Sequence, residues 1–91
     1  MVIGKNCNIH KNVTIGQENR GERKGTPTIG DNVYFGIGCV VVGKINVGND
    51  VLIAPGAFVN VNVPSHSIVI GNPCRIISRE NATKGYIQNG V

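Results

Sequence analysis

Branched aliphatic residues recur every six positions between Ile3 and Pro64. The fifth position of each complete block is also apolar, whereas the third is often polar. Nine blocks show this pattern: IGKNCN from Ile3, IHKNVT from Ile9, IGQ from Ile15, IGDNVY from Ile29, FGIGCV from Phe35, VVGKIN from Val41, VGNDVL from Val47, IAPGAF from Ile53 and VNVNVP from Val59. A period of six with apolar first and fifth positions fits neither an amphipathic helix nor an alternating strand.

The six-residue period predicts an all-β fold, a parallel β-helix of about three coils. Each block would supply one short strand and one turn, and three blocks would complete a triangular coil that pairs with the next. The first residue would point inward, the second would have little space, and the fifth would pack at the corner. Residues 18 positions apart should then form columns: Ile29 with Val47, Val33 with Val51, Phe35 with Ile53, and Val41 with Val59.

Residues 17–27 (QENRGERKGTP) interrupt the repeat with five charges, two glycines and a proline. Such a segment cannot be core, so we expect a loop that protrudes from one corner. Ile3 and Ile9 should then head the same columns as the later blocks. A loop that leaves a regular solenoid is where such proteins commonly carry their function.

The segment 64–75 contains two prolines, which cannot continue a strand ladder, and it is expected to close the helix. The β-helix domain would then span residues 1–77. Residues 78–91 would form a short C-terminal tail, which we expect to pack back through Tyr86 and Ile87.

The composition agrees with a narrow solenoid. The 91 residues include 13 glycines but only two Tyr, two Phe and no Trp. Glycine suits the corners because a positive φ costs it little, and a narrow triangular prism has no room for Trp. The net charge is +4, but the nine basic residues are scattered without interleaved aromatic residues, so we expect no nucleic-acid partner.

Targeting signals and cysteine usage both point to the cytoplasm. No apolar run approaches the roughly 18 residues of a membrane span, and the N-terminus lacks the apolar stretch of a leader peptide. We therefore expect no membrane association. Cys7, Cys39 and Cys74 are odd in number and have no CxxC spacing, which argues against disulfides and zinc. Cys7 and Cys39 occupy the small inward slot and are expected to be buried, inert thiols.

The hexads, the charged loop after IHKNVTIG and the ending VPSHSIVIGNPCRII together resemble the left-handed parallel β-helix acyltransferases, which carry hexapeptide repeats. The most similar branch is that of the serine acetyltransferases. The resemblance covers residues 2 to about 78, and it alone implies the left hand, which departs from the usual rule for parallel connections. It implies acetyl transfer from acetyl-CoA to a hydroxyl, that of L-serine or of a sugar.

The resemblance also implies a site. Members of the family work as homotrimers, with a histidine as general base and a backbone N–H that stabilises the oxyanion. The motif match would place CoA in a corner groove lined by Gly36, Ile37, Gly38, Ala54, Pro55 and Gly56. The family's closing motif appears here as Gly71-Asn72-Pro73-Cys74-Arg75, so Arg75 would face the CoA phosphates; otherwise it is a solvated surface arginine.

Two departures from the family pattern concern histidine. The family's base lies one coil before the segment CNIHKNVTIG, which would put it before Met1, and Lys24-Gly25-Thr26-Pro27 lacks the histidine that precedes the loop proline in relatives. We therefore expect a truncated member. Its alternative role is a catalytically incomplete trimeric scaffold that binds CoA.

The chain has two histidines of its own. His10 is the candidate for a substitute base, the alternative being a plain surface residue. His66 is expected to be a solvated loop residue. The zinc-dependent carbonic anhydrases share this helix but need three histidine ligands, so we expect no metal.

Overall fold

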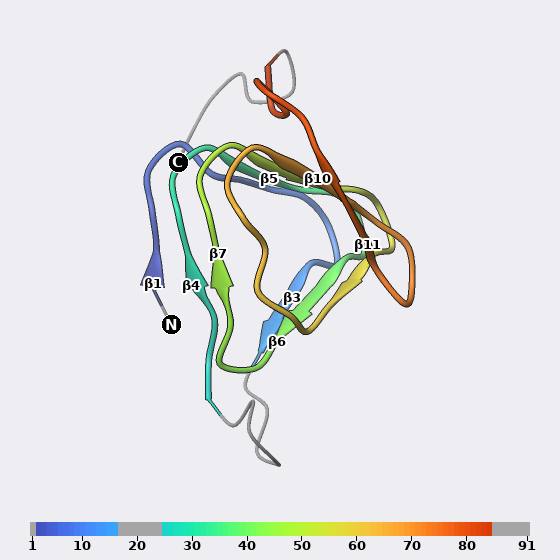
Figure 1. Cartoon of the computed structure of the whole chain (residues 1–91). Coiled ribbons are helices and arrows are strands. Elements are labelled where there is room, and N and C mark those ends of the chain that lie inside the picture. The colour runs from blue at the N-terminus through green and yellow to red at the C-terminus, as the bar shows by residue number, and fades with distance from the viewer. Residues whose placement is uncertain (1, 17–24, 85–91) are drawn as a thin grey trace.

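The computed structural model describes residues 2–16 and 25–84, which contain eleven short strands and no helix. The chain winds through these strands as a stack of triangular coils (Figure 1). The strands are β1 (Val2–Ile3), β2 (Asn8–Ile9), β3 (Thr14–Gly16), β4 (Thr28–Ile29), β5 (Val33–Phe35), β6 (Val40–Val42), β7 (Asn46–Val47), β8 (Val51–Ile53), β9 (Phe58–Val59), β10 (Ser67–Ile70) and β11 (Arg75–Ser78).

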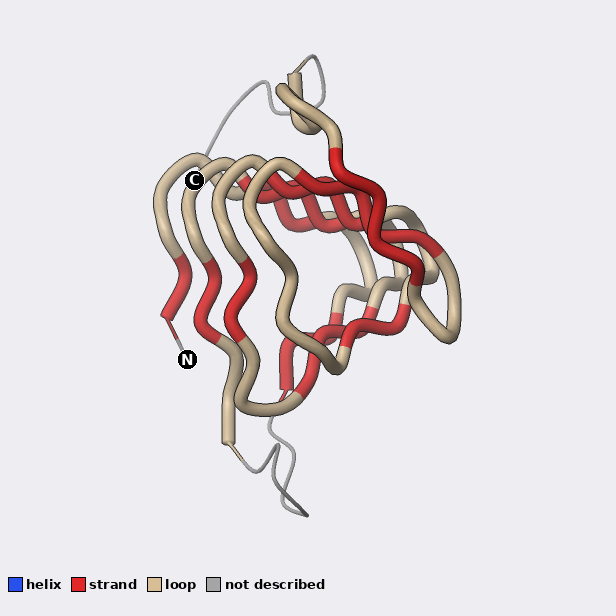
Figure 2. The backbone as a smooth tube through the Cα atoms, viewed as in Figure 1, coloured by secondary structure: helices blue, strands red, loops and turns tan. Residues whose placement is uncertain are grey.

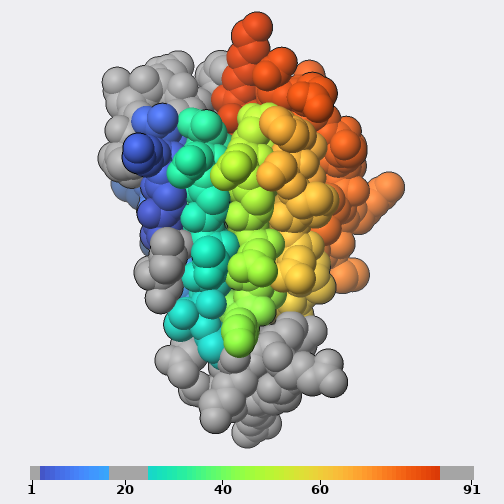
Figure 3. Space-filling view, turned by 60° about the vertical axis from the view of Figure 1, so that its left-hand side comes forward, coloured from blue at the N-terminus to red at the C-terminus, as the bar shows by residue number. Residues whose placement is uncertain are grey.

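Each coil contributes one strand to each of three sheets. The sheets have the orders β1-β4-β7, β11-β10-β8-β5-β2 and β3-β6-β9, and every strand pair is parallel except β10 with β11. Strands occupy the three faces and turns occupy the corners (Figure 2). In Figure 3 the coils appear as successive bands of colour lying side by side. The expected all-β parallel β-helix of about three coils is confirmed.

The strand register agrees with the columns expected from the six-residue period. The aligned pairs are Ile29 with Val47, Val33 with Val51, Phe35 with Ile53, and Val41 with Val59. The columns also continue across the interruption, since Ile3 aligns with Ile29 and Ile9 with Phe35. The insertion after β3 therefore leaves the pairing of the coils on either side of it unchanged. Residues 17–24 of this segment lie outside the described residues.

The stacked columns fill the interior of the prism as one continuous cluster of apolar side chains. Most position-five residues are buried, among them Cys7, Cys39 and Ala57 at 0% exposure. Phe35 is also fully buried and is the largest such side chain, so the prism is wide enough for a phenyl ring. Pro27 is fully buried too, and the expectation that all of residues 17–27 stay out of the core was wrong at this residue.

The closing segment differs from the expectation. Within 64–75 the chain forms one more parallel strand, β10, in which Ser67 aligns with Val51 of β8. The chain then reverses, and β11 pairs antiparallel with β10, with Arg75 opposite Ile70. Proline therefore sits before and after the last parallel strand without preventing it.

The described part of the C-terminal tail packs back against the helix. Tyr86 and Ile87 lie outside the described residues. Among the described tail residues, Ala82 and Thr83 are buried, at 4% and 7% exposure. In residues 2–16 and 25–84, no helix is long and apolar enough to cross a membrane.

Candidate functional site

Three turns stack at the corner that joins the second sheet to the third; we call it the glycine corner. They are His10–Val13, Gly36–Cys39 and Ala54–Ala57. In the second and third turns the last N–H donates to the first carbonyl at 3.2 Å. Their third residues, Gly38 and Gly56, have φ of 72° and 74°. A type II turn requires this positive φ, and the sequence Pro55-Gly56 is its usual signature.

The glycine corner is tight on its inner side and open on its outer side. A Cβ at Gly36 would lie 2.5 Å from the backbone nitrogen of Pro55, so this position can carry no side chain. At Gly38 and Gly56, by contrast, a Cβ would meet nothing within 4 Å. The result is a strip of uncovered backbone across two coils, with Ile37 beside it at 54% exposure.

His10 lies at the first-coil end of the glycine corner. Its backbone N–H donates to the carbonyl of Phe35 at 3.4 Å, which places it directly beside Gly36. Its ring centroid is 4.8 Å from that of Tyr34, and the two rings are tilted by 53°. The exposed imidazole is therefore positioned by an aromatic neighbour at one end of the strip.

Arg75 lies at the other end. Arg75 is exposed and stands opposite Ile70 in the pair of β10 and β11. The residue before Ile70, Val69, accepts a hydrogen bond at its carbonyl from the N–H of Ala54 at 2.8 Å, which links β10 to the glycine corner. With about 4.8 Å between neighbouring strands, the four steps from His10 to Arg75, from β2 to β11 across the sheet, span roughly 19 Å. The fold thus places the six predicted corner residues between His10 and Arg75, and it keeps those two side chains apart.

Comparison with known proteins adds a second line of argument. No family model matches the chain. The chain is 38% identical over 78 residues to the serine acetyltransferase of Synechococcus elongatus, covering 86% of this chain and 32% of the relative. The structure of the Neisseria gonorrhoeae serine acetyltransferase in complex with serine is similar with a TM-score of 0.75 and 34% identity, over 85% of this chain and 31% of that one. A maltose O-acetyltransferase structure from Clostridium difficile 630 is similar with a TM-score of 0.57 and 37% identity, over 62% and 30%.

Over most of its length, the chain is similar to the serine acetyltransferase branch of the hexapeptide-repeat acyltransferases. Its fold is the left-handed parallel β-helix of those enzymes. The chain spans about a third of the length of the relatives that it matches.

The two inward thiols of the helix are protonated near neutral pH. Burial raises the pKa of the Cys39 thiol to about 11, and burial likewise raises the pKa of Cys7. Thiolate is the reactive form, so both cysteines are inert, as expected from their inward position. Among the described residues no group of three His, Cys, Asp or Glu side chains could hold a metal ion.

His66 lies in the turn before β10 and is not merely a solvated loop residue, because its side chain has partners in the structure. Its side chain is 47% exposed, but its Nδ1 lies 2.8 Å from Oδ2 of Asp50. This hydrogen bond raises the pKa of His66. Burial would raise the pKa of Asp50, but hydrogen bonds from Thr83, His66 and Ala82 outweigh it and lower that pKa to about 2.

Sequence reasoning missed this cluster. At the fourth position of IGKNCN and IGDNVY stands asparagine, whereas VGNDVL has Asp50. Asn6, Asn32, Asp50 and His66 all have φ between 56° and 58° and occupy equivalent turns. Asparagine, aspartate and histidine all adopt this conformation more readily than most residues, so the presence of Asp50 and His66 in these turns did not by itself indicate a contact with the tail.

Proposed function

We propose that the chain carries the acetyl-CoA-dependent O-acetyltransferase helix of a serine acetyltransferase and transfers an acetyl group to the hydroxyl of L-serine. The observation that carries the proposal is the similarity of its coils to the serine-bound Neisseria gonorrhoeae enzyme at 34% identity. The similarity to a maltose O-acetyltransferase keeps a sugar hydroxyl as the second acceptor to test. The setting would be the cytoplasm, and the working unit a homotrimer with sites between neighbouring helices.

The glycine corner suits a long, thin acyl-CoA substrate. Because Gly38 and Gly56 present bare backbone, an extended pantetheine arm could lie against them, with Ile37 and Pro55 as apolar neighbours. Arg75, at one end of the strip, would pair with a phosphate, which a guanidinium binds through two parallel hydrogen bonds. The acetyl end would then point toward the first coil.

His10 is the general base in this proposal. Its imidazole would take the proton of the serine hydroxyl as the oxygen attacks the thioester carbon. A corner N–H would stabilise the negative charge on the carbonyl oxygen. The intermediate would then expel the CoA sulfur, which takes up the proton from His10, leaving O-acetylserine and free CoA.

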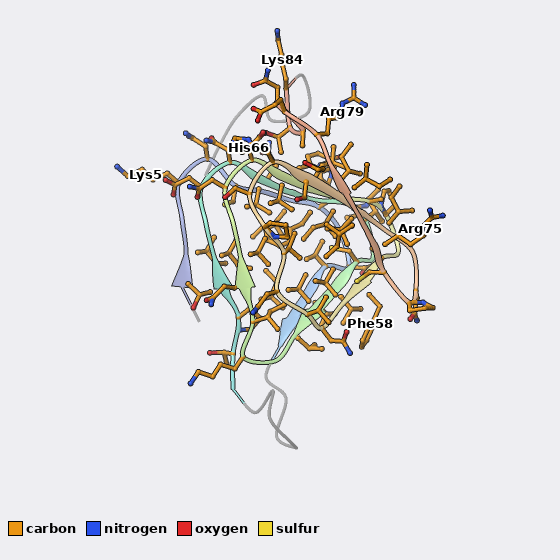
Figure 4. The ribbon with its side chains drawn as sticks, in the orientation of Figure 1. Lys5, Phe58, His66, Arg75, Arg79 and Lys84 are labelled. Atoms are coloured by element: carbon orange, nitrogen blue, oxygen red, sulfur yellow. The ribbon has the colours of Figure 1, made fainter. Side chains whose placement is uncertain are left out.

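The phosphate contact of Arg75 predicts a change in CoA affinity. Arg75→Ala should weaken CoA binding about tenfold, since a hydrogen bond to a charged group is worth about 1.5–3 kcal/mol. Isothermal titration calorimetry measures the affinity of each variant for CoA and for dephospho-CoA, which lacks one of the phosphates. Arg79→Ala is the matched control because Arg79 lies well away from Arg75 (Figure 4) and should leave affinity unchanged. Equal affinity of wild type and Arg75→Ala for both ligands would exclude the contact.

The base role of His10 predicts a loss of turnover. The wild-type protein should form O-acetylserine from acetyl-CoA and serine, and His10→Ala should slow this at least about a hundredfold. The product should be measured by mass spectrometry. A colorimetric assay of the CoA thiol would have a background, because the partly exposed thiol of Cys74 would react with the same reagent. His66→Asn, which leaves the glycine corner intact, serves as the control.

The same assay separates the alternatives. Product from maltose but not from serine would move the acceptor to a sugar. CoA binding by a trimer without any turnover would favour the catalytically incomplete scaffold over the enzyme. Full activity of His10→Ala would assign the base to another group. Light scattering gives the oligomeric state in the same samples.

A further inference from the structure

Residues 79–84 dock against a corner of the helix on the opposite side of the second sheet from the glycine corner; we call this segment the clasp. The chain leaves β11 and turns back over the start of β10, with Arg79 and Lys84 above His66 in Figure 4. Within the clasp, the N–H of Lys84 donates to the carbonyl of Asn81 at 3.0 Å. Ala82 and Thr83 are its buried residues, at 4% and 7% exposure.

One carboxylate holds the clasp. Oδ1 of Asp50 accepts hydrogen bonds from the N–H of Thr83 at 3.0 Å and from its hydroxyl at 2.7 Å. Oδ2 accepts from the N–H of Ala82 at 3.0 Å and contacts Nδ1 of His66 at 2.8 Å. Asp50 is therefore saturated by three donors of the clasp and one of the helix. Such charge-assisted bonds are roughly twice as strong as neutral ones.

His66 connects the helix to the clasp a second time. The N–H of Arg79 donates to the His66 carbonyl at 2.7 Å. The same Nδ1 that meets Asp50 lies 3.8 Å from Oε2 of Glu80, a clasp residue whose side chain is 83% exposed. A protonated His66 thus stands between a carboxylate of the helix and a carboxylate of the clasp.

We propose that residues 79–84 are a proton-sensitive clasp, held on the helix by the Asp50 carboxylate and tightened when His66 carries a proton. The proposal concerns a corner remote from His10 and Arg75. It therefore stands whether or not the chain has acetyltransferase activity.

The direction of the pH dependence follows from the two groups. The pKa of Asp50 is lowered from 3.8 to about 2 in the folded state, so its contribution is present above 3.8 and is lost as the pH falls toward 2. The pKa of His66 is raised above 6.5, so its contribution is complete below 6.5 and is lost as the pH rises through the folded value. The clasp should be tightest between these limits.

Other charges around the clasp do not reverse this direction. Arg79 and Lys84 are on the clasp itself and are exposed, and Asp31 is one coil away, joined to Asp50 through its backbone carbonyl. Glu80 is the clasp group that gains from protonation of His66. Because Glu80 is mostly exposed, its part should be small, about twofold to threefold in the docking equilibrium.

Amide hydrogen exchange tests the clasp directly. The N–H groups of Ala82 and Thr83 should be protected, and Asp50→Asn should reduce their protection factors at least about tenfold, because a neutral amide replaces a charged acceptor. The Ala54 N–H, in the strand ladder, is the internal control and should keep its protection. If Asp50→Asn lowers the protection of the Ala54 N–H as well as that of the clasp, Thr83→Val is used in its place, since it removes only the hydroxyl donor to Asp50 and should lower the protection of the clasp alone.

The proton-sensitive part has its own control. From pH 5 to pH 8 the protection of Ala82 and Thr83 should fall about twofold to threefold in the wild type and stay flat in His66→Asn. Asparagine keeps the turn, because Asn6 and Asn32 already occupy equivalent positions with positive φ. The pKa of His66, measured by NMR, should fall in both Asp50→Asn and Glu80→Gln. Unchanged protection in Asp50→Asn, or a flat wild-type profile, would overturn the proposal.

Discussion

Phe35→Ala is expected to lower the free energy of unfolding by about 4 kcal/mol, the range found when a fully buried phenyl ring is removed. Phe35 has 0% exposure and lies in a column between Ile9 and Ile53 of the neighbouring coils. The stacked backbone holds the coils apart, so they cannot close over the space that the ring leaves. Since domains of this kind are stable by only about 5–15 kcal/mol, urea denaturation should show a large drop in the midpoint.

Phe58→Ala is the matched control for this prediction. Phe58 begins β9 and points away from the column, and its side chain is only partly buried (Figure 4). Phe58→Ala should lower the free energy of unfolding by about 1 kcal/mol, because the side chain that it removes is only partly buried. Similar losses for the two variants would mean that the interior column is not the main source of stability.

The fold could be predicted from the sequence because two properties repeat together. The first residue of every block and the fifth residue of every complete block are apolar, and the spacing between equivalent blocks is constant on each side of the insertion. One misplaced residue would turn the inward set outward, so the register follows directly. The columns Ile3–Ile29–Val47 and Ile9–Phe35–Ile53 were accordingly predicted correctly, even across residues that break the repeat.

The capacity of the prism and the last strand could not be read in the same way. A periodic pattern says which side chains point inward, but the width of the interior depends on how all three sheets pack. The full burial of Phe35 is therefore a property of three strands at once. Similarly, the first residue of β10, Ser67, aligns with Val51, which is 16 positions earlier, whereas aligned residues in the regular coils are 18 positions apart. This shorter spacing does not fit the six-residue period, so the pattern did not predict the strand.

The sequence predicted the residues of one corner of the helix but not the role of the residues at the opposite corner. Glycine with positive φ at Gly38 and Gly56 follows from turn chemistry alone. The opposite corner uses asparagine, aspartate and histidine at the same φ, and the role of Asp50 depends on a segment more than thirty residues later in the chain. No local pattern contains such a contact, so the clasp became visible only in three dimensions.

Gly36→Ala is expected to destabilise the helix by about 3 kcal/mol, at the upper end of the cost of overpacking. Gly36 does not have a positive φ, so alanine is not excluded by the backbone conformation. What excludes it is space: the new Cβ would lie 2.5 Å from the Pro55 nitrogen and 2.8 Å from the Ile53 carbonyl oxygen. These are backbone atoms of the next coil, held by the ladder bond from the Gly36 N–H to the Ile53 carbonyl at 2.8 Å. The coils must separate to admit one methyl group.

Gly16→Ala separates this explanation from the general effect of removing a glycine. Gly16 also stands second in its block and also lacks a positive φ, but its Cβ would meet Val42 at 3.6 Å, an ordinary contact. Alanine there should leave stability unchanged or raise it by up to about 1 kcal/mol, because the unfolded chain loses conformational freedom. Denaturation of both variants gives the comparison. If Gly16→Ala were as damaging as Gly36→Ala, close stacking of coils could not be the reason for glycine at the second position. A loss confined to Gly36→Ala assigns that glycine to the spacing between coils, at the same corner where Gly38 and Gly56 leave the outer surface open.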